Sequence, residues 1–513
     1  MPTRVRSKRV SSVREVSAPP TFGHLDSAAT ECLRAVGRSV LGDPHYPEAL
    51  LGQFPGVVMS SATTTVGSSD PDEDARGRDS MSPLVRLFVY HEILDSRAAT
   101  EGIRPLVLAV LEKTGLIERQ GTRVVARFGI DRWGPIAVLH DWPEWNEHPD
   151  QVMGFSTAGR SLAWFTPTTR VGRVLDLGTG SGIQAILAAT HAEEVVAVDV
   201  NKRAVQLATA SVCLNGLTNV DVRLGSWFEP VVGSRFDLVV SNPPFVISPE
   251  HHFVYRDSGK EGDELCRALL SDAPSHLAPG GVMVMLAEWA GRHGDQDWRA
   301  TPSRWLRDLV VDGLAIRYRA SSPREYATRW NQIEHADPSR RDQAVGAWLA
   351  EYERLGLAAF YEGVLALRAH GPGERRPPAH WTVPANRQLD GPAGDQLLRV
   401  FNGHTTTEGR TTDEILRAAA RPVDGHSLYQ EIRYEHGEHL LGQIRAGFGT
   451  GLGVDVVISP EDLPLVLSLD TERPVGALLD DSDRDPHQLA ELVTALARGG
   501  IIDLEMTSGG ATS

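Results

Sequence analysis

A glycine-rich loop between a short apolar segment and a helix start constrains the fold of this chain most strongly. Residues 175–182 read LDLGTGSG, with Gly178, Gly180 and Gly182 at alternate positions. Glycines so placed let the backbone turn tightly and approach a ligand closely. The following helix presents free N–H groups at its first turn, where an anionic group binds. We interpret the segment as a strand–loop–helix unit that holds a ligand; the alternative is a tight turn without one.

Apolar segments of strand length alternate with helical segments over residues 151–370. This alternation predicts an α/β fold with a doubly wound, mostly parallel seven-stranded sheet. Residues 323–356 lie between the last two expected strands and predict a helical insertion, which could form a wall or lid over an active site. The expected strands are 172–180, 195–200, 220–228, 235–245, 280–289, 314–322 and 360–370.

Segments on either side of this core predict accessory domains. In the first, residues 24–150, the segment 82–94 has helical apolar spacing. Residues 104–130 read as a helix, a stop at Gly115 and a hairpin, which is similar to the last helix and wing of a winged helix. Winged helices bind DNA or serve as docking and dimerisation modules, and we expect a main role other than DNA binding. The remaining segments are expected to be a disordered tail (1–23), a linker (371–384) and a C-terminal mixed α/β domain (385–513).

Charge and composition weigh against several classes of protein. The formal net charge is −16 and the pI is about 5.6, which disfavours a dedicated nucleic-acid binder. Cys32, Cys213 and Cys266 form neither a zinc motif nor a disulfide framework, so a cytoplasmic localisation fits. We see no apolar run of membrane-spanning length, and no apolar stretch of a secretory signal follows the basic start. We therefore expect no membrane partner, and we consider a homodimer formed through the accessory domains.

Acidic residues accompany the first two expected strands. Asp176 directly precedes the glycine loop, and Asp199 ends the next strand roughly 20 residues further on. A carboxylate at that strand end can accept hydrogen bonds from both ribose hydroxyls of an adenosine. The alternative is a cap on the following helix. Nicotinamide binding is disfavoured, because Ile183 occupies the third glycine position of the G-x-G-x-x-G pattern.

A second loop, Asn242-Pro243-Pro244-Phe245, closes the fourth expected strand. A planar NH₂ group donates its lone pair into its π system and is a poor nucleophile. The Asn242 side-chain oxygen and the Pro243 carbonyl can each accept one of its N–H bonds and draw the nitrogen toward tetrahedral geometry. The prolines hold these acceptors in place, and Phe245 can stack on the planar group. The alternative is a Pro-rich loop without chemistry.

These motifs together resemble the class I S-adenosylmethionine (SAM)-dependent methyltransferases, in particular the HemK/PrmC-like and small-ribosomal-RNA-methyltransferase-like group. The resemblance covers about residues 151–290 and includes RDSGKEGDEL and LAPGG after the NPPF loop. It implies a Rossmann-like fold, SAM as the cofactor and direct N-methylation of an amide or exocyclic amine. PrmC-like enzymes carry NPPY, whereas this chain has NPPF, as in the ribosomal RNA branch.

The resemblance also assigns the cofactor-binding residues. Ser226 stands where many relatives have an Asp for the adenine amino group, so we expect backbone groups and packing on Trp227 to hold the adenine. Asn242 lies where the methyl group of the cofactor is expected. The residues that match the family's methionine and ribose motifs are Asp176, Gly178, Thr179, Gly180, Gly182, Asp199 and Val200.

Three acceptor classes stay open: a protein glutamine or other amide, an RNA base amine, and a small molecule such as a natural product. Further alternatives are transfer to another atom of a natural product, and a non-catalytic SAM-binding interaction protein. Intact Asp176, Asp199 and Asn242 argue against the non-catalytic alternative. We expect direct in-line transfer without a metal.

Three other groups of residues invite a functional interpretation. The segment EHGEH (435–439) satisfies neither zinc-helix spacing, so we interpret it as solvated surface. His251 and His252 follow the NPPF loop, and an exposed loop pair is the preferred interpretation. Glu288 and Trp289 end the fifth expected strand on the crevice side and are candidate acceptor contacts.

Overall fold

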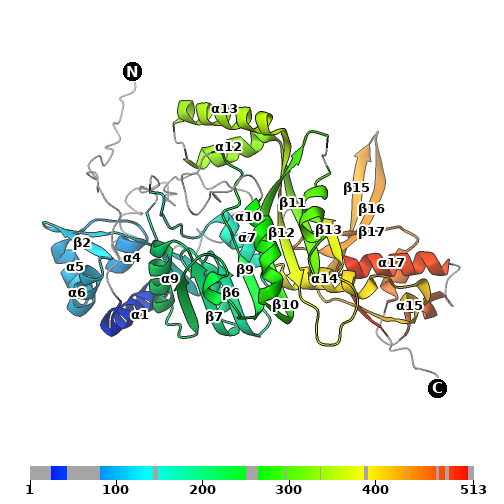
Figure 1. Ribbon diagram of the computed structural model, residues 1–513, viewed down its shortest axis with the longest axis horizontal. Helices are drawn as coiled ribbons and strands as arrows, with labels where there is room; N and C mark the ends of the chain where they lie inside the picture. The colour runs from blue at the N-terminus through cyan, green and yellow to red at the C-terminus, as the bar shows by residue number, and fades with distance from the viewer. Residues whose placement is uncertain are drawn as a thin grey trace.

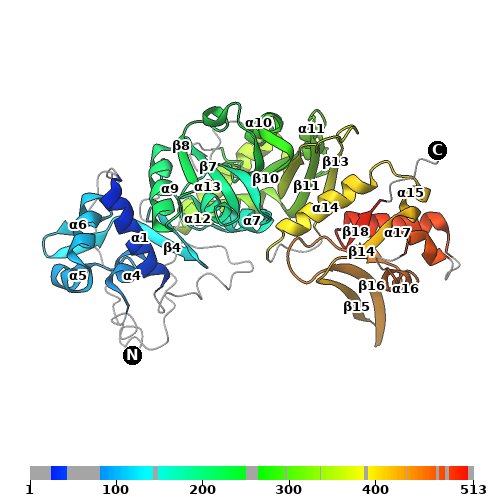
Figure 2. The ribbon, with the colours of Figure 1, turned by 90° about the horizontal axis from the view of Figure 1, so that it is seen from below.

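The structure is a computed structural model, and its elements form three parts in a row (Figures 1 and 2). A central sheet lies between an N-terminal group of small helices and strands and a C-terminal mixed α/β group. The predicted tail 1–23, His251, His252 and His436 lie outside the described residues. The structure describes residues 25–42, 81–142, 148–249, 264–294, 297–334, 337–385, 391–435, 437–469, 473–479 and 484–506.

The central sheet has eight strands in the order β13-β11-β12-β10-β9-β6-β7-β8. Neighbouring strands from β10 to β8 are parallel, and β12 is antiparallel to both of its neighbours. The Rossmann-like α/β class and all seven expected strands are confirmed. The strands are β6 (Val171–Leu177), β7 (Ala192–Asp199), β8 (Val220–Leu224), β9 (Phe236–Ser241), β10 (Leu277–Arg292), β11 (Asp312–Ser321), β12 (Leu357–Arg368) and β13 (His380–Pro384).

The eighth strand corrects two expectations, the seven-stranded sheet and the linker over 371–384. Residues His380–Pro384 form β13, which pairs with β11 in parallel. Trp, Thr and Val in this segment favour a strand. Proline ends β13 at the edge of the sheet, where it costs least.

Helices cover both faces of the sheet. On one face α7 (Thr157–Phe165), α8 (Ile183–Ala188) and α14 (Gly394–Thr407) pack against alternate strand residues such as Val240 and Leu286. On the other face α10 (Glu264–Asp272) and α11 (Ala300–Leu306) pack against residues such as Val239 and Met285. This alternation follows from the two-residue repeat of a strand. It places Asp176 and Asn242, which continue the first set, on the α7 and α8 side.

Two helices lie between β11 and β12 in the chain, where an insertion was predicted: α12 (Pro323–Glu334) and α13 (Pro338–Leu355). They lie above the carboxyl ends of the parallel strands (Figure 1). There β10 extends past β9, because Ser241 at the end of β9 pairs with Met285 while β10 runs on to Arg292 along β12. The insertion therefore stands beside the NPPF loop.

The N-terminal part joins the core through α9 (Lys202–Leu214). Gly37 of α1 approaches this helix so closely that an added Cβ would lie 1.9 Å from the Leu214 carbonyl oxygen. A three-stranded sheet of order β1-β3-β2 accompanies the small helices. The winged-helix assignment stays a prediction, as does a homodimer through this region. The elements are α1 (Ser27–Leu41), α4 (Pro83–Phe88), β1 (Leu94–Asp95), α5 (Ser96–Gly102), α6 (Pro105–Lys113), β2 (Ile117–Gln120), β3 (Arg123–Ala126), β4 (Gly129–Trp133) and β5 (Ile136–His140).

The C-terminal part contains two small antiparallel sheets, one of β14 and β18 and one of β15, β16 and β17. The segment 435–439 spans the tip of the β15–β16 hairpin, where Glu435 pairs with Glu438. No helix in the described part of the chain is both long and apolar enough to cross a bilayer. The remaining elements are α15 (Thr412–Arg417), β14 (Ala419–Pro422), β15 (His426–Glu435), β16 (Glu438–Phe448), β17 (Val456–Ile458), α16 (Leu463–Leu467), α17 (Pro486–Arg498), β18 (Ile502–Glu505) and the short 3₁₀ helices η2 (Glu229–Val231), η3 (Ala273–His276) and η4 (Val475–Leu479).

Candidate functional site

Three strand ends bring the predicted site residues to one edge of the sheet. Leu177 of β6 pairs with Val198 of β7 and with Ser241 of β9. The Ser241 hydroxyl also donates a hydrogen bond of 3.0 Å to the Leu177 carbonyl. The glycine loop, Asp199 and Asn242 directly follow or end these three strands. In open parallel sheets ligands bind at this carboxyl edge.

The glycine loop has the backbone geometry that requires glycine. Gly178, Gly180 and Gly182 have φ angles of 73°, 57° and 92°, in the left-handed region. The N–H groups of Gly178 and Thr179 donate to the Val198 carbonyl at 2.9 and 3.0 Å, which fixes the turn against β7. An added Cβ at Gly180 would meet no described atom within 4 Å, so the loop has an open side for a ligand.

Asp176 is a buried carboxyl with one free oxygen. Its Oδ2 accepts hydrogen bonds from the Thr179 hydroxyl at 2.7 Å and from the Ala185 N–H at 3.0 Å. Its Oδ1 is buried and has no hydrogen-bond partner among the described residues. Burial raises the pKa of Asp176 to about 7, against the lowering effect of its two hydrogen bonds. A cationic ligand group at Oδ1 would complete this site.

Asp199 accepts backbone hydrogen bonds at both oxygens. Oδ2 accepts from the Gly180 N–H at 2.9 Å, and Oδ1 accepts from the Asn201 N–H at 2.8 Å. Burial raises the pKa of Asp199, while these N–H donors act in the opposite direction. Each carboxylate oxygen keeps a further lone pair, so the group can brace the glycine loop and still accept ribose hydroxyls. Val200 follows it and is exposed.

Trp227 lies against the glycine loop in a strained backbone conformation. Its φ angle is 47°, which is costly for a bulky side chain. Its Cζ3 atom lies 3.7 Å from the position of an added Cβ at Gly178. Such strain persists only where the surroundings enforce it, and it concentrates at functional sites. The half-buried ring is therefore a candidate platform for an adenine, whereas Ser226 is exposed.

Asn242 carries the second free oxygen of the site. Its Oδ1 atom is buried and has no hydrogen-bond partner among the described residues. Pro243 is buried, and Phe245 is half-buried and packs against three separate apolar clusters. An unpaired buried amide oxygen costs free energy unless a donor completes it. The arrangement can therefore receive an N–H group from a ligand.

Glu288 and Trp289 belong to opposite faces of β10, and only Glu288 stands on the Asn242 side. Trp289 is fully buried in the core and donates from Nε1 to the Trp298 carbonyl at 2.9 Å, so the expectation of an acceptor contact at Trp289 is wrong. Glu288 accepts a hydrogen bond from the Tyr326 hydroxyl and lies 3.7 Å from Arg329. Burial and the neighbouring Glu362 raise the pKa of Glu288.

Tyr326 and Arg329, which contact Glu288, were not identified as site residues from the sequence. Both lie on α12, and their three-residue spacing places them on one face of that helix. This spacing was the available signal.

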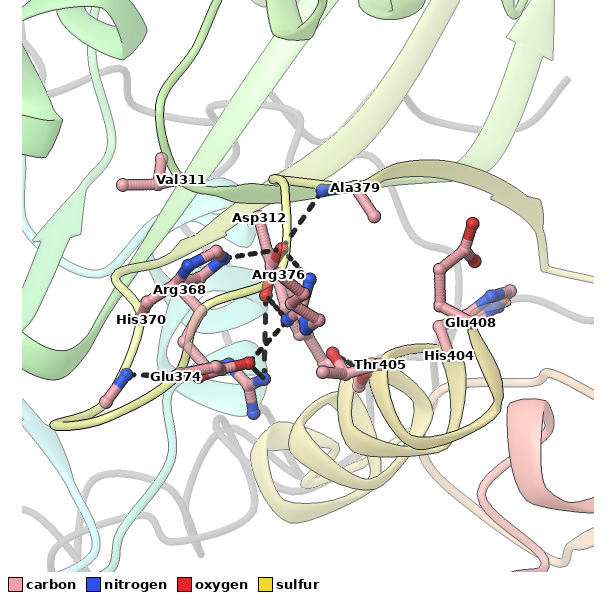
Figure 3. Close-up of polar contacts among 12 residues, drawn as sticks. Val311, Asp312, Arg368, His370, Glu374, Arg376, Ala379, His404, Thr405 and Glu408 are labelled. Carbon is pink, nitrogen blue, oxygen red and sulfur yellow. Dashed lines mark hydrogen bonds and ion pairs between the residues drawn. The ribbon is translucent and has the colours of Figure 1, made fainter. Parts of the chain in front are cut away.

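A separate cluster of acidic and histidine side chains lies at the amino ends of the parallel strands, where β11 begins (Figure 3). Asp312, His370 and Glu374 each offer an atom within 4.8 Å of the others, as metal ligands do. However, Arg376 binds both Asp312 oxygens, and Arg368 lies 3.5 Å away. Burial acts to raise the pKa of Asp312, but hydrogen bonds from Arg376, the Ala379 N–H and His370 outweigh it and lower that pKa. The cluster is an ion-pair network that ties the segment before β13 to the sheet.

Comparisons with known proteins match the same part of the chain. A family model described as "Methyltransferase small domain" matches residues 156–292. A release factor glutamine methyltransferase from Xylella fastidiosa is 38% identical over 129 residues, covering 23% of this chain and 47% of that protein. A ribosomal RNA small subunit methyltransferase C from Alcanivorax borkumensis is 36% identical over 116 residues, covering 23% of this chain and 32% of that protein. The chain thus spans about half, or less, of the length of these relatives.

Among solved structures, the T. thermophilus 16S rRNA N2 G1207 methyltransferase in complex with AdoMet and guanosine is similar to this chain. The sequence identity is 17% and the TM-score is 0.28, with 54% of this chain and 64% of that chain covered.

Proposed function

We propose that this chain, whose residues 156–292 match the methyltransferase small domain, is a SAM-dependent N-methyltransferase acting on a planar amide or exocyclic amine nitrogen. The observation that carries the proposal is the buried, unpaired Oδ1 of Asn242 beside the glycine loop, within the described residues. A hydroxyl acceptor has one polar hydrogen and a carbon acceptor has none, so neither could donate to both Asn242 Oδ1 and the Pro243 carbonyl. A primary amide or amine has two N–H bonds, which Asn242 Oδ1 and the Pro243 carbonyl would share.

The residues of the chain would divide the work between them. SAM supplies an activated methyl group when bound. Asp176 Oδ1 would pair with the cationic end of its methionine part, Asp199 would accept the ribose hydroxyls, and Trp227 would support the adenine. Asn242 would hold the acceptor nitrogen so that its lone pair points at the methyl group. Because the nitrogen becomes acidic only as it gains positive charge, its proton can leave to water without a strong base.

We further propose that the acceptor is a glutamine side chain of a protein. The similarity to a release factor glutamine methyltransferase supports this class, and a glutamine amide is a planar NH₂ group. The net charge of −16 disfavours an RNA acceptor, because nucleic-acid binding depends on neutralising phosphates. An RNA base amine is the second candidate, supported by the NPPF sequence and the similarity to a ribosomal RNA methyltransferase. We further propose that the reaction takes place in the cytoplasm, because both candidate acceptors are components of the translation machinery.

A transfer assay tests the proposal. The full chain would be incubated with tritiated-methyl SAM and, separately, a purified peptide-chain release factor or small-subunit ribosomal RNA. We expect label in the release factor and none in its Gln-to-Ala variants at the modified position. Label in the RNA alone would replace the proposed acceptor by the second candidate. No binding of SAM by calorimetry would contradict the proposed function itself.

A further inference from the structure

Two tyrosines of the helical insertion bind the main chain at Ile247, two residues after the NPPF loop. The Ile247 N–H donates to the Tyr326 hydroxyl oxygen at 3.0 Å, and the Tyr352 hydroxyl donates to the Ile247 carbonyl at 2.8 Å. Tyr326 is on α12 and Tyr352 is on α13, so both helices take part. Both side chains are buried, as is Ile247. The N–H and carbonyl of Ile247 are thus satisfied by the insertion and not by the sheet.

Tyr326 is itself held in place. Its hydroxyl, while accepting from Ile247, donates to Glu288 of β10. Its ring stacks on Phe360 of β12, with the ring centres 4.2 Å apart. Arg329, one turn further along α12, pairs with Glu288 and Glu362. The hydroxyl therefore links Ile247 to β10, and the ring of the same side chain contacts β12.

Apolar packing acts in the same place. Val246 and Ile247 belong to one buried cluster with Trp348, Val345 and other residues of the insertion, and Phe245 packs against this cluster. Residues 242–248 have no regular secondary structure. Tertiary contacts therefore determine where this loop, and Asn242 at its start, is held. Among the described residues the insertion supplies the side-chain hydrogen bonds to Ile247.

We propose that Tyr326 and Tyr352 are positioning residues of the methyl transfer, which hold Asn242 and Pro243 in register with the cofactor through the main chain of Ile247. This inference rests on the proposed function. The two tyrosines act on the loop and not on the acceptor. Misplacing a reacting group by about 1 Å can cost roughly 100-fold in rate, so loosening the loop should reduce turnover without weakening SAM binding.

Substitutions by phenylalanine test the proposal, because Tyr326→Phe and Tyr352→Phe each remove one hydroxyl oxygen and keep the ring. We expect kcat to fall roughly 10- to 100-fold in each, with the SAM dissociation constant changed by less than about two-fold. Amide exchange in peptides covering 243–249 should rise in both variants. Val345→Ala, in the same cluster but without a loop hydrogen bond, is the matched control. It should lower stability at least as much as the tyrosine variants but change kcat and loop exchange clearly less than they do, because both hydrogen bonds to Ile247 remain.

The outcomes separate this inference from the proposed function. Equal loss of kcat in the tyrosine variants and in Val345→Ala would overturn the positioning role and leave a merely structural one. If the wild-type chain bound no SAM and transferred no methyl group, the proposed function would fail. In that case amide exchange alone decides the loop contact, and unchanged exchange at 243–249 in Tyr326→Phe overturns it.

Discussion

Polar side chains are buried in different ways at the carboxyl ends and at the amino ends of the parallel strands in the central sheet. At the carboxyl edge, Asp176 and Asn242 each leave one buried oxygen without a partner among the described residues. At the opposite edge, Asp312 is equally buried, but both of its oxygens accept hydrogen bonds from Arg376, and the His370 side chain and the Ala379 N–H add further ones. Both regions contain a buried aspartate. They differ in whether the buried oxygens accept hydrogen bonds from described residues.

This difference separates a binding site from a structural network. An unpaired buried polar atom costs roughly 1–3 kcal/mol, so a fold keeps one only where a ligand completes it or where strain is stored. A fully paired buried charge needs no ligand and is strongly destabilised when one partner is lost. Acidic residues in a cluster are therefore a poor indicator of function by themselves. Buried atoms without a hydrogen-bond partner also occur elsewhere in the described residues, for example Arg399 Nε and His404 Nδ1, so the free oxygens are informative because they coincide with the glycine loop and the NPPF loop. The following predictions test this contrast.

Removing the carboxylate at the satisfied edge should have the largest effect, and it should be on stability. Asp312→Ala leaves Arg376 and Arg368 without their buried partner, so the free energy of unfolding should fall by about 3–5 kcal/mol. Urea denaturation followed by circular dichroism measures it. Asp297→Ala, which breaks an exposed pair with Arg299, should change stability little. A SAM affinity that falls in Asp312→Ala while the protein stays folded would contradict the structural role.

Removing the free oxygen of Asn242 should instead affect the chemical step. Asn242→Ala should lower the single-turnover rate roughly 10²–10³-fold, by analogy with the loss of one preorganised donor in an oxyanion hole. Stability should hardly change, because the lost oxygen has no partner in the described structure. SAM affinity, measured by calorimetry, should also stay close to wild type. Full turnover in this variant would remove the basis of the mechanism.

Asp199 is intermediate between Asp312 and Asn242, because both of its oxygens already accept a hydrogen bond and can accept further ones. Asp199→Ala loses charge-assisted hydrogen bonds worth about 1.5–3 kcal/mol, so SAM affinity should weaken roughly ten-fold or more. Asp221→Ala, at an exposed carboxylate of β8, is the control and should leave the affinity unchanged. Unchanged calorimetric affinity in Asp199→Ala would show that this carboxylate only braces the glycine loop.

The free oxygen of Asp176 should make SAM binding depend on pH. Its pKa is raised to about 7 in the folded protein, and a cationic ligand group binds the ionised form. SAM affinity should therefore rise roughly ten-fold from pH 6 to pH 8, and Asp176→Asn should lose this dependence. Without SAM, the raised pKa favours the folded form with a protonated Asp176. Its contribution to the free energy of unfolding is therefore full below the ordinary aspartate pKa of 3.8 and is lost as the pH rises toward about 7. An affinity that is flat with pH would contradict the assignment.

The placement of Asp176, Asp199 and Asn242 at one edge of the sheet could be predicted from sequence because its signals are local. The strands β6, β7 and β9 each end in a residue or loop that can be recognised in the sequence. Parallel strands bring their carboxyl ends to one edge of the sheet. Asp176, Asp199 and Asn242 lie where these rules place them. No knowledge of distant contacts was needed.

The helical insertion could be predicted from sequence, but its side-chain contacts with the chain after the NPPF loop could not. Tyr326 and Tyr352 contact Ile247 across 79 and 105 residues of chain, and no local pattern encodes such pairs. The expectation for Trp289 was wrong because side chains keep alternating between the two faces where β10 extends beyond β9. The Trp289 ring therefore lies in the core beside Trp298, on the face opposite to Glu288. The strand β13 was missed because its Pro-rich approach resembles a linker.

The position of the transferred methyl group tests the central claim most directly. The full chain would transfer a ¹³C-labelled methyl group from SAM to a purified release factor, and mass spectrometry with NMR of the digested product would locate it. We predict one new methyl group, on the side-chain nitrogen of a glutamine. Asn242 Oδ1 would accept a hydrogen bond from the N–H of that amide during the transfer. A methyl group on an oxygen or a carbon atom would contradict it.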